Sequence, residues 1–328
     1  MTGVSIVVPS YRRPERLARC LAALDAQRPR ADEVLVVCRA DDAATRSVLA
    51  GSPSARRIDV SASGVLHAMR AGARAARNEL IGFVDDDAEP RPGWLAGTLE
   101  RLADPTVGGV GGRDLVDPHP QHRPKRDVGR ITPLGKLVGD HHLGTGQARD
   151  VDVLKAADMV FRRQALALPD GLRGDGAQMH FEIATCLWAI ARGWRLVYDP
   201  DLVVDHLAGP RFDDDARGVQ SARAARNAAF NLVLCVGALR PELLRRRLLF
   251  GLLIGDQGGP GVVRAGVALA RRESEVARRF WPSVTGHVAA YRRLRSSGEL
   301  TLYTYPEPGV EVAVSSGSRR ATPEEAPG

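Results

Sequence analysis

Leu80-Ile81-Gly82-Phe83-Val84-Asp85-Asp86-Asp87 is the stretch of sequence that decides the fold. Its apolar run is bounded by polar residues and predicts a buried strand. Carboxylates at the carboxyl end of such a strand lie where ligands bind in open α/β sheets. Adjacent negative charges repel one another unless a cation neutralises them, and hard divalent cations prefer carboxylate oxygen. Taken alone, the triplet is explained equally well as an acidic turn that caps the next helix, with Pro92 in its first turn.

Strands and helices alternate around this stretch. Residues 4–8, 33–37 and 107–110 predict further buried strands, and residues 58–60 predict a weaker one. Apolar residues at helical spacing predict helices over 14–24, 41–49, 64–77 and 94–102. The glycine-rich residues 108–112 are interpreted as tight turns. This alternation predicts an α/β fold with a mostly parallel sheet and helices on both faces.

Composition narrows the class of protein. The chain has 328 residues, of which 44% are hydrophobic and 26% charged, as in a globular protein of one large domain or two. Aromatic residues are only 5%, so base stacking on a nucleic acid has few platforms. The net charge of +7 therefore favours phosphate-bearing substrates or an anionic membrane, and we expect no nucleic-acid partner.

Two further features concern location. Four widely spaced cysteines lie inside apolar segments without the spacing of a zinc site, which indicates buried free thiols. A strand begins almost at the first residue, which leaves no room for a signal peptide, and no apolar stretch approaches the roughly 20 residues of a membrane span. We therefore expect a cytoplasmic protein, either free or peripheral on the inner face of the membrane.

The turn after the first strand excludes two nucleotide-binding motifs. Pro9-Ser10-Tyr11-Arg12-Arg13 stands where a dinucleotide-binding fold has G-x-G-x-x-G. The P-loop pattern G-x-x-x-x-G-K-[ST] does not occur either. The first half of the chain is thus Rossmann-like in its order of elements but lacks the usual phosphate-binding loops.

In this order, the motifs resemble a family 2 glycosyltransferase of the GT-A fold, over roughly residues 4–210. The matching blocks are residues 4–13, Asn78, Asp85-Asp86-Asp87 as the D-x-D element, residues 92–95, Phe181-Glu182 through Gly193-Trp194, Tyr198-Asp199-Pro200, and His206. Each block alone is weak, but their order and spacing together are specific. The resemblance implies a GT-A-type sheet, a nucleoside-diphosphate sugar as donor, and inverting transfer.

The resemblance also implies which residues hold the donor. Pro9, Ser10 and Tyr11 match the turn that contacts the nucleotide. After the second strand the family has Asp-Asp-Gly-Ser, whereas this chain has Cys38-Arg39-Ala40-Asp41-Asp42, so the acidic pair is displaced. Arg39, Asp41 and Asp42 are therefore all candidates for the nucleotide, and Arg39 could equally face a phosphate. Asn78 is a further donor-binding candidate.

A metal site follows from the same resemblance. Asp85 and Asp87 are the expected ligands of Mg²⁺ or Mn²⁺, with Asp87 the principal one. Asp85 and Asp86 are also expected to contact the ribose or the sugar. His206 ends an apolar run and either completes the metal site or contacts the phosphates. A structural histidine satisfied by backbone groups is an equal alternative.

Glu182 is the candidate catalytic base. It stands about eleven residues before Gly193, at the start of a helix marked by Ile183, Cys186 and Leu187. Family members most often have Glu-Asp there, and this chain has Phe181-Glu182. Without the resemblance, we would interpret Glu182 as a carboxylate that complements the helix dipole, worth about 0.3–1 kcal/mol.

The composition and the extent of the resemblance divide the chain into three parts. Residues 1–209 are expected to form the glycosyltransferase domain, and 210–305 a helical region. Within that region, Arg245-Arg246-Arg247 precedes an apolar run that suits a membrane surface, a buried helix or a homodimer contact. The polar residues 306–328 are expected to be a disordered tail.

The resemblance predicts an enzyme of the hexosyltransferase type. It would transfer a sugar to an acceptor hydroxyl of a glycan, a lipid-linked compound or a small molecule, in polysaccharide, glycolipid or other glycoconjugate synthesis. Two alternatives stay open: a nucleotide-sugar-binding protein without turnover, and a sugar nucleotidyltransferase. Nucleotidyltransferases carry a glycine-rich basic loop after the first strand, and Pro9 to Arg13 do not form one.

Overall fold

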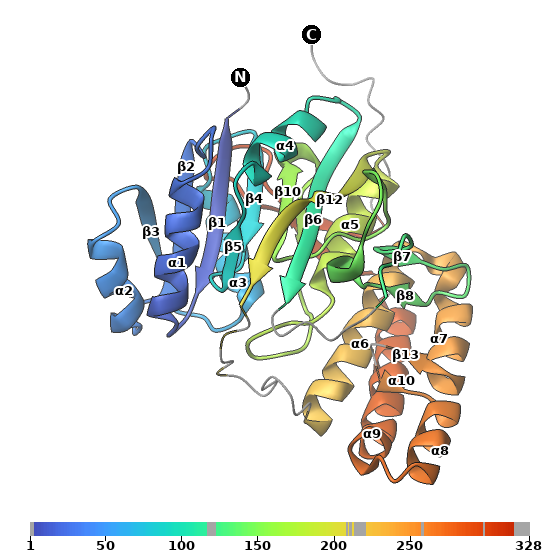
Figure 1. Cartoon of the computed structure of the whole chain (residues 1–328). Coiled ribbons are helices and arrows are strands. Elements are labelled where there is room, and N and C mark those ends of the chain that lie inside the picture. The colour runs from blue at the N-terminus through green and yellow to red at the C-terminus, as the bar shows by residue number, and fades with distance from the viewer. Residues whose placement is uncertain are drawn as a thin grey trace.

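The computed structural model describes residues 3–116, 123–207, 209, 212, 221–256, 259–297 and 299–317. Within these residues, a nine-stranded sheet forms the main body, and a group of helices lies beside it at the lower right of Figure 1. The α/β class predicted from the sequence, with a helical region after it, is confirmed.

The large sheet is mixed, but its strands from the first 84 residues are parallel to one another. From one edge to the other its strands are β3 (Ala55–Val60), β2 (Glu33–Arg39), β1 (Val4–Ser10), β4 (Leu80–Val84), β10 (Asp158–Arg162), β6 (Val107–Val116), β12 (Arg195–His206) and β5 (Ala88–Pro90), and β9 (Arg149–Asp150) pairs with β12. Strands β1 to β4 are parallel, as are β6 and β12, whereas β10 is antiparallel to both its neighbours. The carboxyl ends of β1, β2 and β4 therefore meet at one edge.

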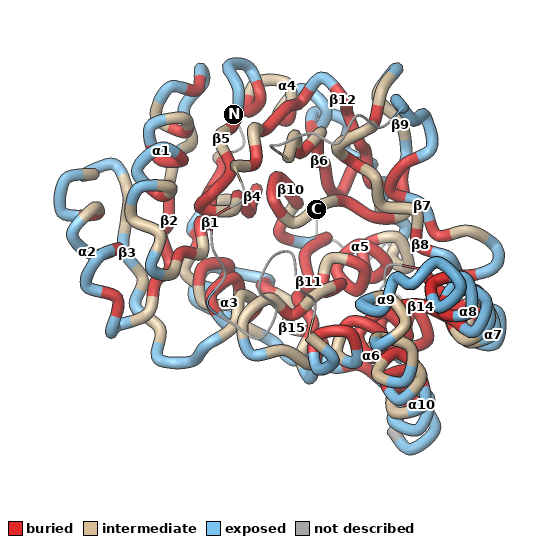
Figure 2. Tube along the Cα trace, turned by 60° about the horizontal axis from the view of Figure 1, so that its bottom comes forward, coloured by how far each residue is buried: buried red, intermediate tan, exposed pale blue. Residues whose placement is uncertain are grey.

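Helices cover both faces of this sheet. They are α1 (Pro14–Asp25), α2 (Ala43–Ala50), α3 (Val65–Ala75), α4 (Trp94–Arg101) and α5 (Phe181–Ala191). Alternate side chains of β1 explain the two layers, since Ile6 and Val8 belong to the core that includes Leu17 of α1, and Val7 to the core that includes Met69 of α3. The strands are accordingly buried in the middle of the molecule (Figure 2).

Strand β6 corrects the interpretation of the glycine-rich segment. Residues 108–112 lie inside this strand and not in turns. A Cβ atom on Gly109 would lie 2.7 Å from the ring of Phe161, and one on Gly112 would overlap the backbone carbonyl of Leu202. Glycine is needed here because the neighbouring strands approach β6 too closely for a side chain.

The helical region follows the sheet. It comprises α6 (Ala222–Leu239), α7 (Leu244–Leu253), α8 (Val262–Ala270), α9 (Ser274–Arg278) and α10 (Phe280–Ser297), with the short hairpin of β13 (Gly255–Asp256) and β14 (Gly259–Pro260) between α7 and α8. Helix α6 packs against α5 and α10 and so joins the region to the main body. A search of the described helices for the length and apolar character of a membrane span finds none.

The end of the described chain returns to the main body, which contradicts part of the expected disordered tail. Strands β15 (Thr301–Thr304) and β16 (Val312–Ser315) pair with each other and, through β15, with β11 (Ala167–Pro169). Glu311 also accepts hydrogen bonds from Nε and Nη2 of Arg70, each 3.1 Å long. The expectation was wrong for residues 306–317 because Val312–Ser315 pair with β15, which in turn pairs with the distant β11. Residues 318–328 lie outside the described part. A second small hairpin joins β7 (Arg130–Ile131) to β8 (Leu137–Val138).

Candidate active site

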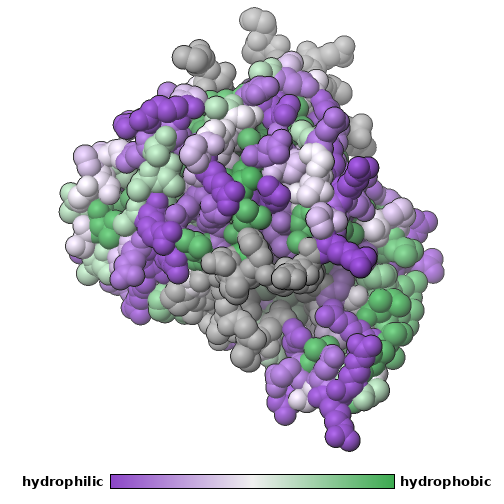
Figure 3. All heavy atoms as spheres, viewed as in Figure 1, coloured by the Kyte–Doolittle hydropathy of each residue, from purple (hydrophilic) through white to green (hydrophobic). Residues whose placement is uncertain are grey.

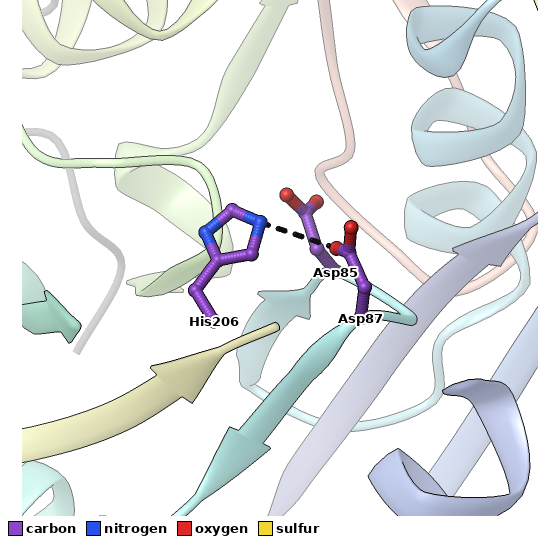
Figure 4. Close-up of side chains that lie close together, drawn as sticks. All are labelled: Asp85, Asp87 and His206. Carbon is purple, nitrogen blue, oxygen red and sulfur yellow. Dashed lines mark ion pairs between the residues drawn. The ribbon is translucent and has the colours of Figure 1, made fainter. Parts of the chain in front are cut away.

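The aspartate triplet lies directly after β4, at the edge where the parallel strands end. Asp86 and Asp87 are buried, and Asp85 is half-buried. Side-chain ligand atoms of Asp85, Asp87 and His206 lie within 4.8 Å of one another. Figure 4 shows the three side chains pointing toward a common point, and Nε2 of His206 is 3.2 Å from Oδ1 of Asp87. The structure therefore brings His206 to two carboxylates of the triplet that precede it by more than 115 residues.

Strand pairing explains the position of His206. It is the last residue of β12, and the antiparallel pairing of β12 with β5 places it opposite Ala88. Since Ala88 follows Asp87 directly, this pairing holds the imidazole beside the triplet. The backbone N–H of Leu207 also donates to the carbonyl of Asp87 at 2.9 Å. The register of two strands thus fixes the geometry of the cluster.

Arg13, in the turn after β1, neutralises part of the charge of the triplet. Its Nη2 is 2.7 Å from Oδ1 of Asp86, and its Nη1 is 3.0 Å from Oδ2 of Asp87. The backbone N–H of Gly209 donates to the same oxygen of Asp87 at 2.8 Å. One guanidinium therefore joins two buried carboxylates and ties the β1 turn to the end of β4.

The surroundings of the three buried groups Asp86, Asp87 and His206 shift their pKa values in different directions. Burial raises the pKa of Asp86 to about 7, against the opposing effect of Arg13. Burial acts on Asp87 in the same direction, but its hydrogen bond with His206 and the charge of Arg13 hold the pKa of Asp87 well below the ordinary value. For His206, burial lowers the pKa, yet its interactions with Asp114 and Asp87 outweigh this and raise the pKa to about 9. The carboxylates of Asp114 and Asp87 thus favour a positive charge at His206, and a bound metal ion would take the place of the imidazole proton there.

The residues of this cluster fit a divalent metal ion. Carboxylate oxygens are the ligands that Mg²⁺ and Mn²⁺ prefer, and imidazole is accepted by many transition metals. Oδ2 of the buried Asp114 on β6 lies 3.8 Å from Nδ1 of His206. A carboxylate behind a histidine orients the ring in many metal sites. Two carboxylates and a supported imidazole are therefore a chemically suitable set.

The turn after β1 and the end of β2 form the other side of the site. The ring of Tyr11 lies 4.9 Å from the guanidinium carbon of Arg12 and 4.9 Å from that of Arg39. Asp42 is buried, and its carboxylate accepts hydrogen bonds from the backbone N–H of Arg12 at 2.5 Å and of Thr45 at 3.1 Å. Asp42 therefore holds this turn and caps α2. Asp41 is exposed and pairs with Arg39 at 3.0 Å.

Two other donor-binding candidates lie beside the triplet. Ser10, the last residue of β1, is buried, and its hydroxyl favours the ionised form of Asp86. Pro9 precedes it and is half-buried. Both therefore stand at the same edge of the sheet as the metal-ligating candidates.

The structure contradicts the prediction that Asn78 belongs to the site. Asn78 precedes β4, and its side-chain amide donates to Oγ of Ser5 at 3.0 Å. Because β1 and β4 are parallel and Leu80 pairs with Val4, Asn78 lies at the amino-terminal edge of the sheet. The length of β4 separates it from Asp85, and a strand rises by about 3.3 Å per residue. Asn78 is near Asp85 in the sequence, but the two residues lie at opposite ends of β4 and therefore at opposite edges of the sheet.

Glu182 lies in the first turn of α5 and is half-buried. Burial raises its pKa, the positive charge of Lys155 opposes this shift, and the negative charge of Asp85 adds to it. Glu182 is thus close enough to Asp85, on another element of the fold, for the charge of that carboxylate to act on its pKa. The preceding His180 has a φ of 71° and is buried, and burial lowers its pKa to about 4. This histidine is therefore neutral at physiological pH.

Sequence reasoning missed four charged residues of this region. They are Arg13, Asp114, Lys155 and Asp158. Arg13 was visible in the motif after the first strand but carries no local mark that distinguishes it from Arg12. Asp158 is buried at the start of β10, and its Oδ2 accepts a hydrogen bond from the backbone N–H of Gly112 at 2.9 Å. Its role depends on a strand that the sequence did not reveal.

The fold and this edge of the sheet define a GT-A-type glycosyltransferase. A mannosyltransferase from Pyrobaculum calidifontis, solved with GDP-mannose and Mn²⁺, aligns over 90% of this chain and 88% of its own, with 18% identity and a TM-score of 0.52. GalNAc-T7, solved with UDP, GalNAc and Mn²⁺, aligns over 77% of this chain and 51% of its own, with 14% identity and a TM-score of 0.53. TarS of S. aureus aligns over 94% and 98%, with 13% identity and a TM-score of 0.51.

The family assignment is more specific. The sequence model of the family described as "Glycosyltransferase like family 2" matches residues 2–227, well over half of the chain. This chain therefore belongs to glycosyltransferase family 2 and is a glycosyltransferase, as its motifs suggested. No curated protein matches the chain.

The bridge between Arg13 and Asp86 predicts a coupled effect on stability. Arg13→Gln leaves Asp86 buried without its counter-charge, and we expect the free energy of unfolding to fall by about 3 kcal/mol. Asp86→Asn in the same chain removes the orphaned charge and should restore most of that loss. Urea unfolding of both single variants and the double variant, at a pH above the pKa of Asp86, measures the coupling.

Arg245→Gln is the matched control, because Arg245 is exposed. Its effect should stay within about 0.5 kcal/mol. If the losses of the two single variants simply add in the double variant, Arg13 does not neutralise Asp86.

Proposed function

We propose that the protein catalyses metal-dependent, inverting transfer of a sugar from a nucleoside-diphosphate sugar to an acceptor hydroxyl. The observation that carries this proposal is the cluster of Asp85, Asp87 and His206 at the carboxyl edge of the sheet. The effect of Asp85 on the pKa of Glu182 supports a place for Glu182 at the same site. Membership of the family supports the transfer of a sugar. The mannosyltransferase and GalNAc-T7 were both solved with Mn²⁺, which supports a metal at the corresponding edge.

Asp85, Asp87 and His206 would hold Mg²⁺ or Mn²⁺. When bound, such an ion supplies Lewis-acid stabilisation of the negative charge on the diphosphate. Asp114 would keep the ring of His206 oriented, and Arg13 would keep Asp87 in place. These positioning contacts exist among the protein's own residues, so the ligands are arranged before a donor arrives.

The nucleotide would lie against the turn after β1. We assign its base to the face of Tyr11, and its ribose or phosphates to Ser10, Arg39 and Asp41. Pro9 shapes the same turn, and Asp86 lies behind it, paired with Arg13. Asp42, whose carboxylate is occupied by protein donors, would position the turn without touching the donor.

Glu182 would act as the general base. Its carboxylate would accept the proton of the acceptor hydroxyl while that oxygen attacks the anomeric carbon in line with the departing diphosphate. The bond from the anomeric carbon to the acceptor oxygen forms as the bond to the diphosphate breaks, which inverts the centre. A raised pKa suits this role, because a stronger base accepts a proton more readily near neutral pH.

The finer identity of the partners stays a prediction. The acceptor would be a glycan, a lipid-linked compound or a small molecule, used by a cytoplasmic enzyme in polysaccharide or glycoconjugate synthesis. Contact of the helical region with a membrane surface or a second copy is likewise a prediction. The rival function is a nucleotide-sugar-binding protein without turnover, which the unusual Phe181-Glu182 pair favours. Slow, metal-dependent hydrolysis of donor that disappears in Glu182→Gln would exclude this rival.

The metal ligands predict metal-dependent nucleotide binding. Calorimetric titration with UDP, GDP, dTDP and CDP, with and without Mn²⁺, should give binding of one nucleotide only when the metal is present. Asp114→Asn should weaken that binding about tenfold and Asp87→Asn at least about a hundredfold, because the first supports a ligand and the second is one. Glu275→Gln, on exposed α9, is the control and should bind as the original chain does. Equal binding with and without Mn²⁺ would contradict the metal role.

Glu182→Gln predicts a separation of binding from turnover. The amide has the same size but cannot accept the proton, so we expect transfer to fall by about 10²–10⁴-fold. The Kd for nucleotide and Mn²⁺ should stay within about twofold, since the residue does not contact the donor. Single-turnover transfer from the donor that the titration identifies measures the first, and calorimetry the second. A variant that loses nucleotide binding would contradict the assignment of Glu182 as the base.

The raised pKa of Glu182 also predicts the pH profile. The base acts in its ionised form, so transfer should fall as the pH drops through its pKa, at a pH above the ordinary value of 4.5. Since Asp86 also titrates with a raised pKa, nucleotide binding must be followed over the same range. If the rate of transfer falls at acidic pH while the affinity for the nucleotide does not, the loss is due to protonation of the base. If turnover and binding fall together, the loss belongs to the donor site and not to Glu182.

A further inference from the structure

Helix α8 exposes its large apolar side chains and buries its small ones. Its buried residues are Ala265 and Ala268. The side chains that face solvent include Val263, which is 54% exposed, and Leu269, which is 68% exposed. A helix that only covers a protein core does the reverse, because burying the larger side chains removes more apolar surface from water. The apolar face of α8 is therefore directed away from this chain.

Neighbouring helices extend the apolar surface. On α7, Leu249 and Leu253 are exposed and lie one turn apart. At the start of α10, Trp281 is 70% exposed. Helices α7, α8 and α9 are largely exposed in Figure 2, and Figure 3 shows apolar side chains gathered along the α7 side of the helical region. We call the exposed residues of this region the apical surface: Leu249, Leu253, Val262, Val263, Val267, Leu269 and Trp281.

The charges around the apical surface are mainly positive. Residues 262–281 contain five arginines and two glutamates, and Glu275 is paired with Arg278 at 3.1 Å. Arg245 and Arg246 are exposed on α7, on the turn before Leu249. Exposed apolar side chains on elements rich in arginine suit a partner that offers a hydrocarbon interior beneath a negatively charged layer. Exposed tryptophan is also typical of residues at a membrane interface.

We propose that the apical surface docks on an anionic lipid bilayer, with the apolar side chains of α8 and Trp281 entering the interface and the arginines pairing with phosphate headgroups. A second copy of this chain fits less well. Twofold association through this surface would bring the same arginines face to face, and like charges repel. Charge complementarity therefore favours the bilayer.

The orientation of the molecule suits this contact. In Figure 1, β6 points down and β12 points down and to the left, so their carboxyl ends are on the lower side of the molecule, where α8 and α9 lie farther to the right. The edge of the sheet that carries the active site would then face the bilayer. A lipid-linked acceptor follows from this orientation only if the proposed function holds, whereas the docking itself does not depend on it.

The test is binding of the full chain to vesicles without donor, metal or acceptor. Co-sedimentation with vesicles of equal parts phosphatidylglycerol and phosphatidylcholine should remove the protein from solution, and pure phosphatidylcholine should not. Emission of Trp281 should shift to shorter wavelength on binding. The shift should be lost in Trp281→Phe, since Trp94 and Trp188 are buried in the main body and the half-buried Trp194 packs there against Gly108 of β6.

Two kinds of variant separate the apolar from the charged contribution. Val263→Ser with Leu269→Ser should weaken binding on the order of a hundredfold, by removing two side chains from the interface. Val310→Ser with Val312→Ser is the matched control, because these valines are exposed at the C-terminal hairpin, which pairs with β11 of the main body. Arg271→Gln with Arg272→Gln should weaken binding by about tenfold or more and reduce its dependence on salt.

The outcomes decide the proposal in either direction. Weaker binding by both apical variants, with the control unchanged, supports docking on a bilayer. Equal affinity for neutral and anionic vesicles, or no binding at all, overturns it. A dimer in light scattering that Val263→Ser with Leu269→Ser converts to a monomer also overturns it, and assigns the surface to a second copy. Because the experiment uses no nucleotide or sugar, its failure leaves the proposed catalytic function untouched.

Discussion

The structure depends on the neutralisation of carboxylates at the end of β4. Asp86 and Asp87 are buried, and an isolated buried charge would cost far more than the fold could offset. Arg13 and His206 supply the counter-charges, one from the turn after β1 and one from the end of β12. The same contacts that make the charges tolerable also assemble the site. Stability and function therefore share one set of interactions at this edge.

Sheet topology decides which residues can take part. Strand β10 runs antiparallel between β4 and β6, and so separates the first half of the sheet from the β6–β12 pair. Asp158 lies on β10 itself, and Asp114, on β6, lies beyond it. Glycines in β6 allow β12 to pack close to β6, and this pairing places His206 at the end of β12 beside the site. The small residues of β6 thus help to fix the position of His206 on the neighbouring strand β12.

Much of the fold was predictable because its signals are local. Most strands and helices between Val4 and Val110 follow from apolar runs, helical spacing and turn residues, and the structure has them close to their expected bounds. The short strand β5 and the extension of β6 to Val116 were not predicted. Asp85, Asp87 and His206 were also found from their motif, and the structure brings them together. Their ligation of a metal, and the roles of Glu182, Tyr11 and Arg39, stay predictions.

What was missed depends on pairing between distant segments. Arg13 is one of 46 lysines and arginines, and only the fold shows which carboxylates it meets. Asn78 was wrongly placed at the site because a separation of seven residues in the sequence does not reveal that β4 lies between it and Asp85. The C-terminal hairpin escaped notice since its partner β11 lies more than 130 residues earlier. The antiparallel insertion of β10 likewise leaves no periodic mark in a strand of five residues.

The large number of residues between β4 and β12 has a consequence for how the chain folds. Gly209 and Asp87 are 122 residues apart, so their contact closes a large loop whose entropic cost must be met before it stabilises anything. During synthesis the aspartates emerge first, and their ligand partner arrives only after the whole sheet has been made. Partly folded chains would thus be poor metal binders, and an ion that binds would stabilise the finished fold alone. Under the proposed function, metal binding would therefore follow the completion of the sheet.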